Sequence, residues 1–354
     1  MQSSEQLIWI PINAFALCAL LHIFALRLFP KWKLLDFPER YGHKRSRIPY
    51  PTGILGIATF IVIVATFLQP WDKQMIGIIL GVILIGAVSF IDDRKQVSPW
   101  IRLSYQVLAA ILIFLLGTRI FSITNPFVAD GIIKLDAPFI TSAIFNNPPI
   151  LSGLFTLFWL GLTINALNWF DGIPGQVSLL STIGFLTIGF LALSDRVVHV
   201  FPELQLQLAL LAFVLAGISA ASLLFDFPSN RVLMGDTGSM FFGLMLGVLT
   251  IYAGGKVATA FLVLGVPLID SGIVIVRRLS KGVSPFQGNA KDEHLHHRLL
   301  AKGWSERKII ILTAALGSAF GITALFMSTH EKIAAALLLF LIMLGLSWYS
   351  KNNN

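Results

Sequence analysis

Acidic, amide and histidine side chains interrupt or end the long apolar runs of this sequence at four widely separated places. The four clusters are Asp92-Asp93, Asn165/Asn168/Asp171, Asp236 and His294/His296/His297. Mg²⁺ prefers oxygen ligands, typically one or two carboxylates together with phosphates and water. Imidazole and guanidinium groups donate charge-assisted hydrogen bonds to phosphate oxygens. These residue types together are suited to neutralising charge around a phosphorylated ligand.

The first cluster is a pair of adjacent acids at the end of an apolar run. Adjacent carboxylates repel each other, so a site that keeps both charged usually has a cation nearby. Arg94 and Lys95 could supply that charge as part of an ordinary solvated helix end. Ser98-Pro99 is predicted to open the next helix, because proline is tolerated in a first turn.

The second cluster combines two amides and an acid. Asn165 and Asn168 are three residues apart and Asp171 continues the series, so all three lie on one helix face. They offer donors and acceptors to a polar ligand, and Gly172 and Gly175 allow a close approach of the backbone. The alternative is a polar helix end followed by a turn.

The third cluster is Asp236, which lies between Gly235 and Gly238 at the junction of two apolar runs. Asp236 or Thr237 could cap the helix that follows. A glycine-rich helix start can also hold an anion, and the Asp236 carboxylate could ligate a cation. The sequence leaves these alternatives open.

The fourth cluster has three imidazoles within four residues, followed by Arg298. This density suggests zinc, but the His-Glu-x-x-His pattern and a cysteine partner are both absent. With Arg277 and Arg278 upstream, the segment is predicted to bind phosphate oxygens. The alternative is a basic loop that lies at a membrane interface.

Asp270 stands apart because it lies inside an apolar run. An acid within a membrane helix is a functional candidate by default. It could equally form a hydrogen bond to a neighbouring helix.

The composition points to a membrane protein. Of 354 residues, 56% are hydrophobic and 12% are charged, whereas soluble domains carry about 25% charged residues. The mean hydropathy is +0.79. The single Cys18 excludes a disulfide framework and a cysteine-based metal site.

Apolar runs long enough to span a bilayer recur along the chain. They are 7–29, 52–68, 74–91, 103–121, 151–168, 177–194, 205–225, 237–252, 257–276, 308–327 and 333–349. Because backbone groups in lipid must pair with each other, these runs predict helices. We therefore expect an all-α integral membrane protein, a polytopic bundle of about 11 (10–11) transmembrane helices in a single domain, 1–354. The first run is expected to be a retained helix and not a signal peptide, because no basic residue precedes it and no cleavage site follows.

The basic residues give the orientation. With the N-terminus outside, nineteen of the 26 lysines and arginines fall in inner loops, six fall in outer loops, and Arg27 lies in the first run. The positive-inside rule then places the C-terminus in the cytoplasm. All four clusters fall on this inner side. The net charge of +8 suits anionic headgroups and a phosphorylated substrate, while its division among loops argues against nucleic acid as a partner.

Read together, these motifs resemble the polyprenyl-phosphate N-acetylhexosamine-1-phosphate transferases, glycosyltransferase family 4, in the WecA/TagO-like branch related to MraY. The resemblance runs from Asp92-Asp93 to the histidine cluster. Its most specific part begins at Pro267-Leu-Ile-Asp270, continues through Arg277-Arg278 and Pro285-Phe286, and ends at His294-Leu-His296-His297-Arg298.

The resemblance implies transfer of a sugar 1-phosphate, most simply GlcNAc 1-phosphate, from a UDP-N-acetylhexosamine to undecaprenyl phosphate with release of UMP. This is the initiating step of cell-envelope polysaccharide synthesis at the cytoplasmic face of the bacterial inner membrane. It implies Mg²⁺ as cofactor, with Mn²⁺ as the alternative ion, and a homodimer as the candidate assembly. The roles that it implies are catalytic for Asp92, Asp93 and Asp171, metal-binding for Asp236 and Asn168, and substrate-binding for Asn165, Arg102, His294, His296, His297 and Arg298.

Two residues depart from the family pattern. Gln96 replaces the last acid of Asp-Asp-x-x-Asp, and Pro174 replaces the second acid of Asp-Gly-x-Asp-Gly. That second acid is linked to uracil recognition in MraY-like members, so nucleobase recognition here must use another group or differ.

Two other functions fit less well. A transporter would place its ionisable groups near the membrane midplane and show matching broken helices. An intramembrane aspartyl protease would need Gly-x-Gly-Asp, but the sequence before Asp236 is Leu233-Met-Gly235.

Overall fold

The computed structural model describes residues 5–41, 45–125, 131–136, 149–194, 202–252, 261–284 and 293–351. Its elements are α1 (Gln6–Lys31), η1 (Pro38–Tyr41), α2 (Gly53–Phe67), α3 (Lys73–Lys95), α4 (Pro99–Leu115), β1 (Ser122–Thr124), β2 (Ile132–Lys134), α5 (Ile150–Phe170), α6 (Gln176–Ala192), α7 (Pro202–Asp226), α8 (Gly235–Tyr252), α10 (Gly265–Ser280), α11 (Leu295–Ala301), α12 (Glu306–Phe326) and α13 (Thr329–Lys351).

The predicted helical fold is confirmed. Every predicted apolar run overlaps a helix, although residues 257–260 of the ninth run lie outside the described residues and its helix continues to Ser280. Among the described residues, a small hairpin between α4 and α5 departs from the all-α fold, and in it Ile123 lies opposite Ile133. Its strands contain β-branched residues, which favour extended backbone.

The surface of the bundle is that of a membrane protein. Among the described residues, 6 helices are long and apolar enough to cross a membrane, namely α1, α3, α5, α7, α12 and α13, and α2, α4 and α6 are shorter apolar helices. Large apolar side chains are exposed on the outside, including Phe158 at 68%, Leu115 at 70% and Phe326 at 67%. Patches of this kind are rare on soluble monomers. The chain is therefore a polytopic membrane protein.

Two helix starts are set by local caps. Oδ1 of Asp72 accepts the Met75 amide at 2.7 Å at the start of α3. Ser98 caps α4, which has Pro99 in its first turn, so the predicted Ser98-Pro99 helix start is confirmed. These caps satisfy N–H groups that have no partner inside the helix.

Glycines bring α5 and α8 together. A Cβ on Gly243 would lie 2.7 Å from the Thr163 carbonyl oxygen, and one on Gly247 would lie 2.5 Å from Thr163 Oγ1. Small residues of this kind let membrane helices approach closely. Similarly, a Cβ on Gly53 would collide with the backbone of Gly238, so the starts of α2 and α8 are in contact. These close contacts determine which polar helix ends lie next to each other.

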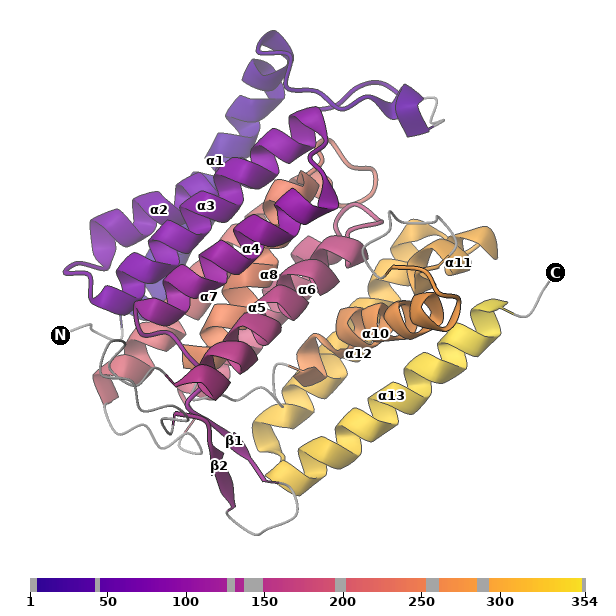
Figure 1. The fold of residues 1–354 in the computed structure, drawn as a ribbon. Coiled ribbons are helices and arrows are strands. Elements are labelled where there is room, and N and C mark those ends of the chain that lie inside the picture. The colour runs from indigo at the N-terminus through magenta and orange to yellow at the C-terminus, as the bar shows by residue number, and fades with distance from the viewer. Residues whose placement is uncertain are drawn as a thin grey trace.

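The bundle has two distinct ends (Figure 1). The β1–β2 hairpin lies at one end, and α11 lies toward the other, where α13 also finishes. The last turns of α3 and α5 and the start of α8 point toward the α11 end. This end holds the candidate site.

Candidate active site

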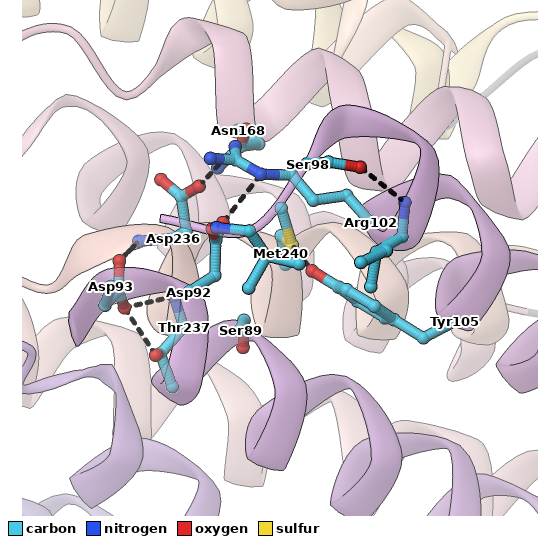
Figure 2. Close-up of polar contacts among 12 residues, drawn as sticks. Ser89, Asp92, Asp93, Ser98, Arg102, Tyr105, Asn168, Asp236, Thr237 and Met240 are labelled. Atoms are coloured by element: carbon cyan, nitrogen blue, oxygen red, sulfur yellow. Dashed lines mark hydrogen bonds and ion pairs between the residues drawn. The ribbon is translucent and has the colours of Figure 1, made fainter. Parts of the chain in front are cut away.

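A buried acid from α3 and an acid from α8 share one arginine from α4. Nε of Arg102 lies 2.7 Å from Oδ2 of Asp92, and its Nη1 lies 2.9 Å from Oδ2 of Asp236. Figure 2 shows the Arg102 side chain reaching between the two carboxylates. The Asp92 side chain is almost fully buried, whereas those of Arg102 and Asp236 are about one-third exposed. Asp92 and Asp236, 144 positions apart in sequence, therefore form one anionic centre that opens to one side.

Asp93 points away from Asp92 and caps the start of α8 (Figure 2). Its Oδ1 accepts the Tyr50 hydroxyl at 2.6 Å and the Asp236 amide at 2.9 Å. Its Oδ2 accepts the Thr237 amide at 3.0 Å and the Thr237 hydroxyl. The sequence suggested Asp236 or Thr237 as the cap, but the carboxylate that accepts the first N–H groups of α8 comes from α3. A catalytic role for Asp93 stays a prediction.

The two amides of α5 have different surroundings. Asn165 donates Nδ2 to Oε1 of Gln106 at 2.7 Å and to the Gly161 carbonyl oxygen at 2.8 Å. Asn168 donates Nδ2 to the Ser239 hydroxyl at 3.1 Å, and it lies beside Arg102 and Asp236 in Figure 2. Asn168 therefore reaches the anionic centre, while Asn165 is held one turn away by α4.

The Asp171 side chain has no hydrogen bond or ion pair within the described part of the chain. It follows directly on the last residue of α5 and is half-buried. Burial raises its pKa well above the usual range, and the carboxylates of Asp226, Asp236 and Asp93 raise it further. A cation at this end of the bundle would relieve both effects.

Asp226 is an acid that the sequence reading missed. It ends α7, is 2% exposed and accepts the Ser178 hydroxyl through Oδ2 at 2.6 Å, whereas its Oδ1 is buried with no partner among the described residues. It also ends the apolar run 205–225, so the rule that singled out Asp92 could have found it. Gln176 was missed as well, and both polar atoms of its buried side chain have no partner in the same described part of the chain.

The histidine segment packs against the end of α5. A Cβ on Gly172 would collide with the His296 ring, and the Phe170 ring meets the same imidazole edge-on at 6.2 Å. Burial, and then the neighbouring His297 and His294, lower the pKa of His296 well below its usual value. The structure thus brings the His296 ring beside Gly172, the residue that follows Asp171.

The arginines around the histidines make contacts of their own. Arg278 bonds Oε2 of Glu293 through Nε at 2.8 Å. Arg298 donates to the Ser347 carbonyl oxygen at 3.0 Å, and Arg277 donates to the Ser347 hydroxyl at 2.8 Å. Arg298 therefore lies against the end of α13, and substrate binding by Arg298 stays a prediction. Pro285-Phe286 of the same motif lies outside the described residues.

Asp270 makes the hydrogen bond to a neighbouring segment that was one of its two alternatives. It lies 2.7 Å from Nδ1 of His294 and accepts the Leu295 amide at 2.9 Å. The acid bonds a neighbouring segment, and that segment carries the histidine cluster.

Comparison with known proteins gives one family. The sequence model for "Glycosyl transferase family 4" matches residues 75–254. The chain is 29% identical over 298 residues to the "Probable undecaprenyl-phosphate N-acetylglucosaminyl 1-phosphate transferase" of Bacillus subtilis (strain 168), covering 82% of this chain and 76% of that protein.

Two further relatives have similar names. The chain is 30% identical over 259 residues to the "Decaprenyl-phosphate N-acetylglucosaminephosphotransferase" of Mycolicibacterium smegmatis, covering 68% of this chain and 60% of that protein. It is 27% identical over 332 residues to the "Undecaprenyl-phosphate alpha-N-acetylglucosaminyl 1-phosphate transferase" of Escherichia coli (strain K12), covering 88% of this chain and 82% of that protein.

Proposed function

The chain belongs to glycosyl transferase family 4, and from this premise we propose that it transfers GlcNAc 1-phosphate from UDP-GlcNAc to undecaprenyl phosphate and releases UMP. The product would be the first lipid-linked sugar of an envelope polysaccharide. The names of two relatives that align with most of this chain support this substrate pair.

One structural observation carries the proposal. Acids from α3 and α8 and the acid after α5 gather with Arg102, Asn168 and the histidine segment at one end of a membrane bundle. Phosphoryl transfer needs positioning and charge neutralisation more than covalent help from the protein. A membrane enzyme whose acceptor is a lipid phosphate needs these groups at the membrane boundary, and the predicted topology places them there.

The donor set fits Mg²⁺. In the part of the chain that the structure describes, no group of three His, Cys, Asp or Glu residues could hold a metal alone. Mg²⁺ is typically bound by one or two carboxylates with substrate phosphates and water. Asp236 and Asn168 would hold the ion, and the raised pKa of Asp171 marks a further carboxylate that a cation would stabilise. The bound ion would neutralise charge on the transferring phosphates.

The acceptor side is assigned to Asp92 and Arg102. Nε and Nη1 of Arg102 form ion pairs with Asp92 and Asp236. Its Nη2 has no partner among the described residues, so Nη2 is the group that would bind the lipid phosphate. Asp92 is fixed by the Val97 amide at Oδ1 and would orient Arg102. It could also receive a proton if the acceptor phosphate enters protonated.

The donor side is assigned to Asp171 and the histidine segment. The contact of the His296 ring with Gly172, next to Asp171, supports this assignment. His294, His296 and His297 would hold the diphosphate or the sugar. Asn165, held by Gln106, would support Asn168 on the same helix face.

For the orientation we propose an extracytoplasmic N-terminus, a cytoplasmic C-terminus and an active site on the cytoplasmic face of a bacterial membrane. The nineteen-to-six excess of basic residues in inner loops supports this. We also propose that residues 1–354 form a single domain.

The test is an assay of purified protein with undecaprenyl phosphate, MgCl₂ and a panel of UDP-sugars. UMP release and a GlcNAc-diphospholipid product are expected with UDP-GlcNAc and not when Mg²⁺ is chelated. Absence of a lipid product with every UDP-sugar would refute the proposal.

A pair of variants ties the activity to the anionic centre. Arg102→Lys should lose most of the turnover, because a lysine cannot reproduce the fork of an arginine that contacts two carboxylates. Arg307→Lys is the matched control, because Arg307 donates to the Pro228 carbonyl oxygen at 2.9 Å and not to the acids. Equal turnover by the two variants would remove Arg102 from the site.

A further inference from the structure

A buried carboxylate and a buried imidazole form a pair beside the candidate site. Oδ2 of Asp270, inside α10, lies 2.7 Å from Nδ1 of His294, just before α11. His294 is 1% exposed and Asp270 is 2% exposed. The second oxygen of Asp270 accepts the Leu295 amide at 2.9 Å. One carboxylate thus holds both the ring and the backbone of this turn.

This arrangement decides how the His294 ring is used. An imidazole that donates Nδ1–H to a carboxylate is fixed in orientation and has only Nε2 left to offer. Nε2 of His294 is buried and makes no hydrogen bond within the described part of the chain. A buried polar atom without a partner in a native protein calls for an explanation, such as a functional role.

The His294 ring packs against residues beside the candidate site. It stacks on the His296 ring at 5.7 Å with an interplanar angle of 10°, and it lies 6.3 Å from the Trp169 ring at the end of α5. The His296 ring itself contacts Gly172, next to Asp171. His294 therefore lies next to the residues that we assign to the donor side of the site.

We propose that Asp270 is a positioning residue for the donor substrate: it holds His294 so that Nε2 accepts a hydrogen bond from a hydroxyl group of the nucleotide sugar. The proposal rests on the proposed function. Because Nδ1–H is donated to the Asp270 carboxylate, Nε2 is the lone-pair acceptor that the ring presents. Asp270 never touches the substrate and acts only through His294.

The test is a double-mutant cycle of Asp270→Asn and His294→Gln, with KM measured separately for UDP-GlcNAc and undecaprenyl phosphate. The first change keeps an oxygen for the Leu295 amide but presents an NH₂ group to Nδ1. The second places an amide oxygen near the Nε2 position, and this acceptor does not need the Asp270 carboxylate. Each single change should lower kcat/KM for UDP-GlcNAc roughly 10- to 100-fold, with KM for the lipid unchanged.

The coupling between the two substitutions shows whether Asp270 acts through His294 or only stabilises the fold. If Asp270 acts through His294, then Asp270→Asn should cost less than about 3-fold when added to His294→Gln. Fully additive losses, or a change confined to KM for the lipid, would overturn the inference. The matched control is Asp72→Asn, which alters a carboxylate cap at the start of α3 and should leave both KM values unchanged.

Two further comparisons keep the test decisive. If Asp270→Asn fails to fold, His294→Gln and His294→Ala replace it: the glutamine variant should retain roughly tenfold more activity than the alanine variant, and equal losses would overturn the inference. Wild-type turnover of UDP-GlcNAc is the premise, so a wild-type protein that makes no lipid product refutes the proposed function. If the wild-type protein converts UDP-GlcNAc and the Asp270→Asn variant has the same KM for UDP-GlcNAc, the inference about Asp270 is refuted and the proposed function stands.

Discussion

The position of Asp93 predicts that its replacement damages the protein by freeing the start of α8. Four donors converge on this one carboxylate, namely the Tyr50 hydroxyl, the Asp236 and Thr237 amides and the Thr237 hydroxyl. With its acceptor positions occupied in this way, Asp93 is poorly placed to take a proton from a substrate. We therefore expect a positioning role, in which the carboxylate sets the place of Asp236.

The magnitude follows from the bonds that are lost. Hydrogen bonds to a charged group contribute about 1.5–3 kcal/mol each, and loss of a helix cap costs about 0.5–2 kcal/mol. Desolvation of the buried acid offsets part of the sum. We expect Asp93→Ala to lower the free energy of unfolding by about 2–4 kcal/mol and Asp93→Asn by about 1–2 kcal/mol. A displacement of Asp236 by about 1 Å would lower turnover by about 10²-fold.

The assay pairs reversible unfolding in detergent with turnover of UDP-GlcNAc. Tyr50→Phe is the matched control, because it removes one of the four donors and leaves the carboxylate; it should cost about 1 kcal/mol and little activity. Asp93→Asn with unchanged stability and a loss of turnover beyond about 10⁴-fold would contradict the positioning role and favour Asp93 as a catalytic base.

Three other predictions follow from the site. Asp236→Asn should fold, lose roughly 10²-fold or more in turnover and require more Mg²⁺, because a carboxylate beside the transferring phosphates is neutralised; near-normal turnover would remove it from the metal site. Pro174→Asp should sharpen the preference for a UDP-sugar over the matching CDP-sugar if an acid at this position reads the uracil edge, and an unchanged preference in an active protein would show that Pro174 does not stand at the base. Cysteines introduced at 195–200 and at 288–292, both outside the described residues, should be labelled from opposite sides of the membrane after Cys18→Ala; labelling of both from one side would refute the orientation.

Much of the architecture could be read from the sequence. Apolar runs of bilayer length predict helices because an unpaired backbone is too costly in lipid, and the helices lie where these runs are. The same reasoning found Asp92, Asp171 and Asp236, since a charged residue that ends an apolar run must lie at a membrane boundary. It also found the Ser98-Pro99 helix start, because capping is local. It did not predict the hairpin, whose strands are three residues long and leave little pattern.

The pairing of these residues was decided only by tertiary structure. Arg102 joins acids ten residues before it and 134 residues after it, and Asp93 caps a helix that begins 142 residues later. No local pattern encodes such partners, because they depend on which helices come into contact, and Gly243 and Gly247 help to set that by letting α5 and α8 approach. The sequence by itself determined that acids and histidines would meet at one face of a helical bundle. Packing decided that Asp93 holds α8, that Arg102 bridges the acids and that Asp270 holds His294, because a hydrogen bond depends on ångström-scale positions that only the assembled helices define.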